Sequence, residues 1–174
     1  MGYDIQAIIS TQSVLEAHSA SFASAAVVPL ASGFALIPIT DELLDEIGAS
    51  GESGRFYKFT PAIADWLRTI SASASAAYIE AEFFGGVGGQ GATVWSHGEQ
   101  ALAPTHEAEA INIALRLLGV LRGTSHDEFE AIGLPRHRGT NGWLNDAIPN
   151  DRKDRKSTRL NSSHPQQSRM PSSA

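Results

Sequence analysis

The amino-acid sequence predicts one α+β domain over residues 1–150, with a mixed or largely antiparallel sheet packed against three to four helices. Two pairs of strand-like segments flank short glycine-containing stretches and predict two hairpins, which join antiparallel strands. Between and after these hairpins, apolar residues recur at helical spacing. Hairpins combined with separate helices are typical of the α+β class.

The strands are predicted from alternating or continuous apolar runs. "YDIQAIIS" (3–10) alternates and predicts the first strand. The runs "AAVVPL" and "GFALIPIT", joined by residues 31–33, predict a buried hairpin. Segments 76–84 and 91–98 favour strands on both sides of a glycine-rich loop and predict the second hairpin.

The helices are predicted from their start signals and buried stripes. Thr11 and Thr40 can cap helices over residues 12–22 and over a short segment from 41. Thr60 followed by proline is a strong helix start. Thr105 is expected to begin the longest helix, which ends at Gly123, and "HDEFEAIG" predicts one more short helix.

The composition limits the compartment and the chemistry. The 174 residues include no cysteine, which excludes disulfides, thiolate metal sites and a cysteine nucleophile. The longest apolar run, residues 25–39, is interrupted by Pro29 and Pro38, whereas a spanning helix needs about 20 apolar residues. We therefore expect a cytoplasmic protein without a membrane segment.

Charge is distributed unevenly along the chain. Residues 1–150 hold 7 Lys/Arg against 17 Asp/Glu, a net of −10, whereas residues 151–174 hold 6 against 2, a net of +4. An acidic body repels phosphate backbones, so nucleic acid is not expected as a partner of residues 1–150. It attracts a basic protein partner instead.

Residues 151–174 differ from the rest of the chain. They are polar, serine-rich and almost free of apolar side chains, so they are expected to be disordered. "KSTRLNSSH" resembles the translation of cloning or adapter DNA, which favours a non-native tail. A natural basic arm that binds nucleic acid or a membrane surface is the alternative.

The segment "GVGGQG" (86–91) matches the dinucleotide fingerprint G-x-G-x-x-G. That fingerprint holds a pyrophosphate only when a helix follows, and here "ATVW" favours a strand. The only lysine of residues 1–150 is Lys58, so the strand after the glycines offers none, and Glu80 and Glu82 lie on the entering strand. We therefore expect no nucleotide and no other cofactor, and interpret Gly85–Gly91 as a hairpin connection that can act as a recognition loop.

Candidate binding residues gather around this loop and at one basic cluster. Glu80 and Glu82, two apart on a strand, share one face and are either an acid–base pair or the wet face of a hairpin. "RHR" (136–138) either binds an anion or partner, or pairs with nearby acids at positions 127, 128 and 130. The histidines lack metal-ligand spacing, so no metal is expected. The candidate binding residues are Glu80, Glu82, Gly86, Gly88, Gly89, Gln90, Arg136, His137 and Arg138.

Three segments, "YIEAEFFGGVGGQGATVW", "GFALIPIT" and "GLPRHRGTNGWL", resemble a family of uncharacterised small bacterial proteins, mainly from high-GC soil bacteria of actinobacterial type. The likeness spans most of residues 1–150 and implies no activity. The compact acidic body is also similar to immunity proteins that neutralise toxins.

Two functional hypotheses follow. The first is an acidic binding protein, immunity-like, that meets a partner through the Gly85–Gly91 loop and the neighbouring acidic surface. The alternative is a small enzyme that uses Glu80 and Glu82 with His137 or Arg138. A cleft in which these groups converge would favour the enzyme.

Overall fold

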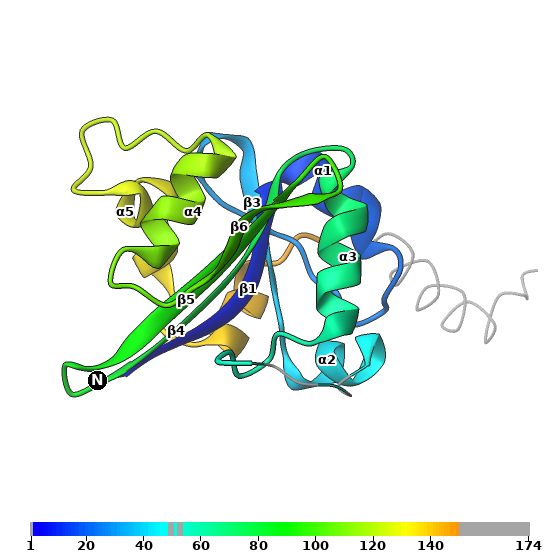
Figure 1. Cartoon of the computed structure of the whole chain (residues 1–174), viewed down its shortest axis with the longest axis horizontal. Helices are drawn as coiled ribbons and strands as arrows, with labels where there is room; N and C mark the ends of the chain where they lie inside the picture. Colours follow the sequence, from blue (N-terminus) through cyan, green and yellow to red (C-terminus); the bar gives the residue numbers. More distant parts are fainter. Residues whose placement is uncertain (1, 49–50, 52–53, 150–174) are drawn as a thin grey trace, which may run out of the picture.

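The computed structural model describes residues 2–48, 51 and 54–149, and these form three layers with one sheet in the middle. Helices α1 (Gln12–Ser19), α2 (Asp41–Ile47) and α3 (Pro61–Ser71) cover one face of the sheet, and α4 (Ala110–Leu118) and α5 (Glu128–Ile132) cover the other (Figure 1). The α+β prediction is confirmed, with five α-helices in the described residues. The tail predicted over 151–174 lies outside them.

The sheet has six strands in the order β2-β3-β1-β4-β5-β6, and every pair is antiparallel. The strands are β1 (Tyr3–Thr11), β2 (Val28–Pro29), β3 (Phe34–Pro38), β4 (Ala76–Phe84), β5 (Val87–Ser96) and β6 (Glu99–Thr105). The predicted first hairpin is confirmed as β2 and β3. Pro29 and Pro38 lie at the ends of these strands, where a missing N–H interrupts little of the ladder.

Each face of the sheet has its own apolar core, because successive strand residues point to opposite sides. Ile5, Ile79 and Val94 face α4 and α5, where Trp143 is fully buried among them. Ile8, Ile37 and Tyr78 face α1, α2 and α3. Strands with helices on both faces are therefore apolar on both sides, which explains the nearly continuous runs in the sequence.

The helix starts that the sequence predicts are mostly confirmed. Thr40 Oγ1 accepts a hydrogen bond from Leu43 N–H at 3.1 Å, and Thr60 Oγ1 accepts one from Ile63 N–H at 3.4 Å. These side chains satisfy backbone donors that the first helical turn leaves unpaired. Thr11 precedes α1 without a side-chain cap.

The prediction of a long helix from Thr105 to Gly123 is wrong at both ends. Thr105 is the last residue of β6, an edge strand that the sequence pattern did not reveal. Helix α4 begins at Ala110 and ends before Gly119, which adopts a left-handed conformation with φ of 98°. Most of β6 is exposed, so its sequence lacks the apolar alternation that identifies a half-buried strand.

A C-terminal segment completes the sheet beside β1. Strand β3 pairs with β1 only from Ala7 onward, so the first half of β1 has an open side. There Asp4 N–H donates to the Arg138 carbonyl at 2.7 Å, and Gln6 N–H donates to Thr140 Oγ1 at 3.1 Å. The following 3-10 segment, Thr140–Asp146, places Trp143 in the core. The two ends of the described chain therefore stabilise each other.

The β4–β5 hairpin extends beyond the helical layers as an arm (Figure 1). Its turn consists of Gly85 and Gly86, with φ of 61° and 81°, as a two-residue turn with positive φ at both positions requires. The prediction that the glycine segment connects antiparallel strands is confirmed. It is not a seven-residue loop, however, because Gly88, Gly89 and Gly91 belong to β5.

Candidate functional site

A pocket of about 310 Å³ opens at the base of the β4–β5 arm, on the sheet face that carries α3. Strands β4 and β5 form its floor, and the segment between α2 and α3 forms one wall. His106, directly after β6, forms another side. The lining residues are Arg55, Tyr57, Glu80, Ala81, Glu82, Gly88, Gly89, Gln90, Gly91 and His106.

Glu80 is buried and fixes the wall of this pocket to the sheet. Tyr57 N–H donates to both of its oxygens at 2.7 and 2.8 Å, and Lys58 N–H donates to Oε2 at 2.9 Å. The Tyr78 hydroxyl donates to the same Oε2 at 2.7 Å. Burial raises the pKa of Glu80, while the hydrogen bonds from Tyr78, Tyr57 and Lys58 lower it in part. Glu80 therefore acts first as an anchor for residues 57 and 58.

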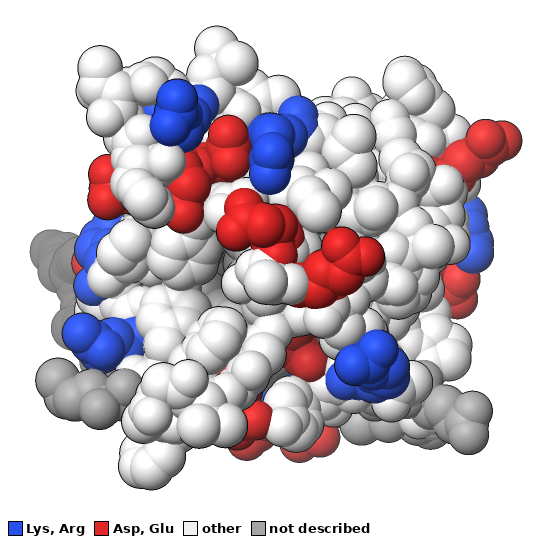
Figure 2. All heavy atoms as spheres, turned by 60° about the vertical axis from the view of Figure 1, so that its left-hand side comes forward, with Lys and Arg blue, Asp and Glu red and all other residues white. Residues whose placement is uncertain are grey.

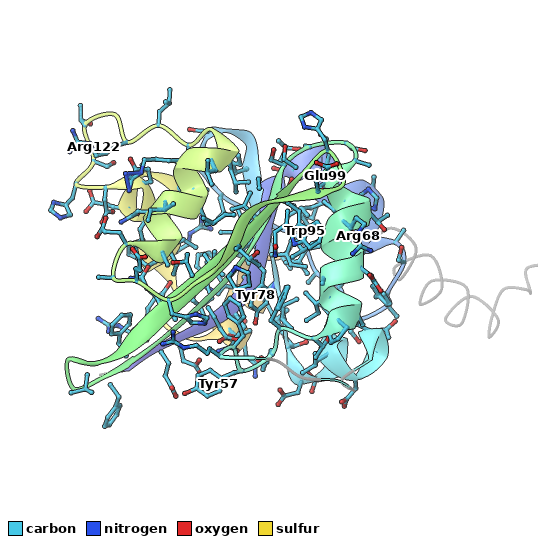
Figure 3. All side chains as sticks on the ribbon, viewed as in Figure 1. Tyr57, Arg68, Tyr78, Trp95, Glu99 and Arg122 are labelled. Atoms are coloured by element: carbon cyan, nitrogen blue, oxygen red, sulfur yellow. The ribbon has the colours of Figure 1, made fainter. Side chains whose placement is uncertain are left out.

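Glu82 lies one step nearer the arm tip and is exposed. It accepts a short hydrogen bond from the Tyr57 hydroxyl through Oε1, and it pairs in register with Asp4 of β1. The hydrogen bond to Glu82 and the charges of Glu82, Glu80 and Asp4 raise the pKa of Tyr57. Figure 3 shows Tyr78 in the interior and Tyr57 near the molecular margin. The acidic pair is thus split into one buried and one exposed carboxylate.

The three glycines of β5 differ in how strongly the structure requires glycine at their positions. A Cβ on Gly88 would lie 1.9 Å from the Glu82 carbonyl oxygen, so that position requires glycine. A Cβ on Gly91 would lie 2.7 Å from His106 Cδ2, so Gly91 makes room for that ring. A Cβ on Gly89 would meet nothing within 4 Å. Neither packing nor backbone conformation requires glycine at that position.

Gln90, another predicted binding residue, points to the opposite face of the sheet. Its side-chain oxygen accepts a hydrogen bond from Ile111 N–H at 2.8 Å, which caps the first turn of α4. Because the first turn of a helix leaves donors unpaired, this contact stabilises α4. Strand β5, which contains the glycines, is followed by strand β6 and not by a helix. In the described chain, β4 and β5 therefore lack the helix N-terminus that holds the pyrophosphate in a dinucleotide site.

His106 and Arg55 are pocket residues that the sequence analysis did not select. The His106 ring packs against the Phe56 ring at a tilt, with ring centroids 4.6 Å apart, and its Nε2 atom is buried without a hydrogen-bond partner in the described residues. Burial, and next the charge of Arg55, lower the pKa of His106 below 6.5. No local pattern marks these residues, because they reach the pocket only through the pairing of β5 and β6.

We expect His106 to make stability depend on pH. Because its pKa is lower in the folded state, the unfolded chain binds the proton first, so its contribution to stability is complete above pH 6.5 and is lost as pH falls through the folded pKa. Urea unfolding between pH 7.5 and 5 is expected to show a smaller loss of stability for His106→Asn than for the wild type. Equal pH dependence in both proteins would contradict this prediction.

The basic cluster 136–138 lies away from the carboxylates of the pocket. Arg136 and His137 both contact Asp146, at 3.1 and 2.7 Å, instead of the acids at 127, 128 and 130 that the sequence suggested. The His137 ring packs at 4.8 Å from Trp143, on the sheet face opposite Glu80. Arg138 is exposed, and its backbone pairs with β1. The pocket therefore does not include His137 or Arg138.

Neither a metal centre nor a membrane-spanning helix is found in the described residues. No three His, Asp or Glu side chains are arranged to hold a metal ion in residues 2–48, 51 and 54–149. Within the same residues, every helix is too short or too polar to cross a bilayer. The pocket itself is lined by carboxylates, a guanidinium, an imidazole, a phenol and backbone amides.

Comparison of the chain with protein-family models, curated proteins and solved structures gives no match in any of the three.

Proposed function

We propose that this chain is a cytoplasmic, immunity-like binding protein that meets a basic protein partner through the β4–β5 arm and the acidic residues at its base. The observation that carries it is the arm itself, which projects from the body and combines an apolar tip with neighbouring carboxylates.

The tip is apolar and open to solvent. Phe84 and Val87, the last cross-strand pair before the turn, are 76% and 77% exposed. Tyr57, beside the base of the arm, is 65% exposed. Aromatic side chains that remain exposed on a projecting hairpin are suited to fill a pocket on another protein, because aromatic residues are enriched at the core of interfaces.

The charge near the tip is negative. Asp4 and Glu82 lie side by side on adjacent strands, and both are exposed. The view in which the left-hand side of Figure 1 comes forward shows basic and acidic side chains close to one another on a mainly uncharged surface (Figure 2). We expect the basic groups of the partner to be attracted mainly by the nearby carboxylates of Asp4 and Glu82. The net charge of −10 over residues 1–150 adds to this attraction.

The enzyme hypothesis has less support. Glu80 accepts hydrogen bonds from two backbone amides and a buried phenol, which occupy the carboxylate that would have to exchange protons. His137 lies on the other face of the sheet, against Trp143. A general base must reach its substrate's proton within hydrogen-bond distance, and these two groups do not share a cleft.

The test begins with affinity isolation from the source organism, with the wild-type protein and a Phe84→Ser/Glu82→Gln variant as baits. A partner that both proteins retain equally would count against the proposal. A basic partner lost from the variant would then be purified and its affinity measured by calorimetry at two salt concentrations. We expect the variant to bind at least about tenfold more weakly, with binding of the wild type weakened by salt.

Leu121→Ser provides the matched control. Leu121 is 85% exposed on the connection between α4 and α5, far from the arm in the fold (Figure 1). Its replacement removes a similar amount of exposed apolar surface but leaves the arm unchanged. Equal weakening by Leu121→Ser would show that the arm has no special role.

A further inference from the structure

The outer edge of β5 is free near the arm tip. β5 pairs with β4 along its whole length, from Val87 to Trp95, but β6 pairs with it only from Ala92 onward. After Thr105 the chain leaves the sheet, and His106 packs over Gly91. In the described part of the chain, no strand therefore continues the sheet beside residues 87–90.

The hydrogen-bonding groups at this edge follow from the turn. A two-residue hairpin turn is closed by a hydrogen-bonded pair, here Phe84 and Val87, and such pairs alternate with non-bonded ones. The N–H and C=O groups of Gly88 and Gln90 consequently point away from β4. They continue the row that β6 uses further along β5, so they can accept another strand.

Gly89 lies between Gly88 and Gln90 and has no side chain, so the sheet face at this edge is uncovered. Glycine lowers strand stability, yet neither backbone conformation nor packing requires it at position 89. It pairs with Glu82, and its missing side chain exposes the carboxylate from the side of the free edge. A bare position in a strand is suited to the close approach of another chain.

Glu82 supplies the charge that selects the ligand. One of its oxygens accepts from Tyr57, and the other has no protein partner in the described residues. An added strand would lie about 10 Å from β4, two strand spacings away, so only a long side chain can reach Glu82 across Gly89. Lysine and arginine have such stems with a cationic end. Arg55 also lines the pocket, and its charge, which acts on His106, repels a second cation.

We propose that an extended, basic segment of a partner protein adds to the free edge of β5 at Val87–Gln90, with a lysine or arginine lying across Gly89 against Glu82. This inference rests on the proposed function and specifies how the basic partner binds. Backbone hydrogen bonds would supply affinity, and the side chain over Gly89 would supply specificity.

The probe is a capped pentapeptide that alternates valine with lysine, titrated into the ¹⁵N-labelled full chain and followed by NMR. The peptide is expected to add antiparallel to β5. In that register the valines lie opposite Gly88 and Gln90 and donate their N–H groups to β5, whereas the lysine opposite Gly89 points its N–H away. N-methylation of the valines is therefore expected to weaken binding roughly tenfold or more, and N-methylation of that lysine is expected to have little effect. The perturbed amides should centre on residues 87–90.

Variants and a charge-reversed peptide complete the experiment. Gly89→Val should abolish binding without unfolding the protein, whereas Gly139→Val, where a Cβ also meets nothing within 4 Å, should not change it. A glutamate version of the peptide should not bind. Glu82→Gln should weaken the lysine peptide.

The outcomes separate this inference from the proposed function. Equal binding of both N-methylated peptides, lost in Glu82→Gln, would overturn strand addition and leave an acidic surface for basic partners. No perturbation at residues 87–90 by the lysine peptide would overturn strand addition too. Peptide binding as described, together with no basic partner that depends on the arm, would reject the proposed function alone.

Discussion

Replacement of Gly88 by alanine is expected to lower the free energy of unfolding by on the order of 4 kcal/mol. The new Cβ would lie 1.9 Å from the Glu82 carbonyl oxygen and 2.7 Å from Phe83 Cα, both backbone atoms that cannot move without opening the hairpin. The φ of 153° adds strain, because residues with a side chain rarely adopt it. Thermal unfolding should show a midpoint lower by on the order of 10 °C.

Gly89→Ala is the matched control, one residue further along the same strand. Its Cβ would meet nothing within 4 Å, and we expect a change of no more than about 1 kcal/mol, in the stabilising direction if the unfolded chain becomes less flexible. A Gly88→Ala protein as stable as Gly89→Ala would show that the two strands are not in the register described.

Glu80→Ala is expected to cost about 3 kcal/mol, with a melting midpoint about 6–12 °C lower. The substitution removes the acceptor of Tyr57 N–H, Lys58 N–H and the Tyr78 hydroxyl. Tyr78 is fully buried, so water cannot easily replace the lost acceptor. Hydrogen exchange at residues 57 and 58 should become faster by a larger factor than in the rest of the protein.

Glu82→Ala serves as the comparison, because Glu82 is exposed and, among the residues that the structure describes, accepts only from the Tyr57 hydroxyl. We expect a cost below about 1 kcal/mol and unchanged exchange at residue 58. If the two variants lost equal stability, the role of Glu80 as the anchor of this segment would be wrong.

The elements that the sequence could predict are those with a local physical cause. Threonine caps at positions 40 and 60 and the glycine turn at 85 and 86 leave signals within a few residues. The missed strand β6 has no such signal, because an exposed edge strand needs no apolar alternation. Its register with β5 is determined by tertiary pairing, which a window of sequence does not contain.

The candidate site was only partly predictable for the same reason. Glu80, Glu82 and the glycines were selected because they are close in sequence and chemically unusual. His106, Arg55 and Tyr57 reach the same pocket from other segments, and nothing in their neighbours marks them. Gln90 was selected as a binding residue, but its side-chain oxygen accepts a hydrogen bond from Ile111 N–H and caps a helix on the opposite face.

The contact between β1 and the segment around residue 140 has a consequence for biosynthesis. A ribosome releases the N-terminus first, and domains generally fold as units once their chain has emerged. Here a central strand depends on residues more than 130 positions later, through Gln6 with Thr140 and through Trp143 in the core. The nascent chain therefore holds an incomplete sheet until residues 140–143 have been synthesised. Ile148 N–H donates to the Val27 carbonyl at 2.9 Å, the last such backbone contact of the described chain. We expect arrested chains that end before Trp143 to remain protease-sensitive, and chains that expose Ile148 outside the ribosome to become resistant.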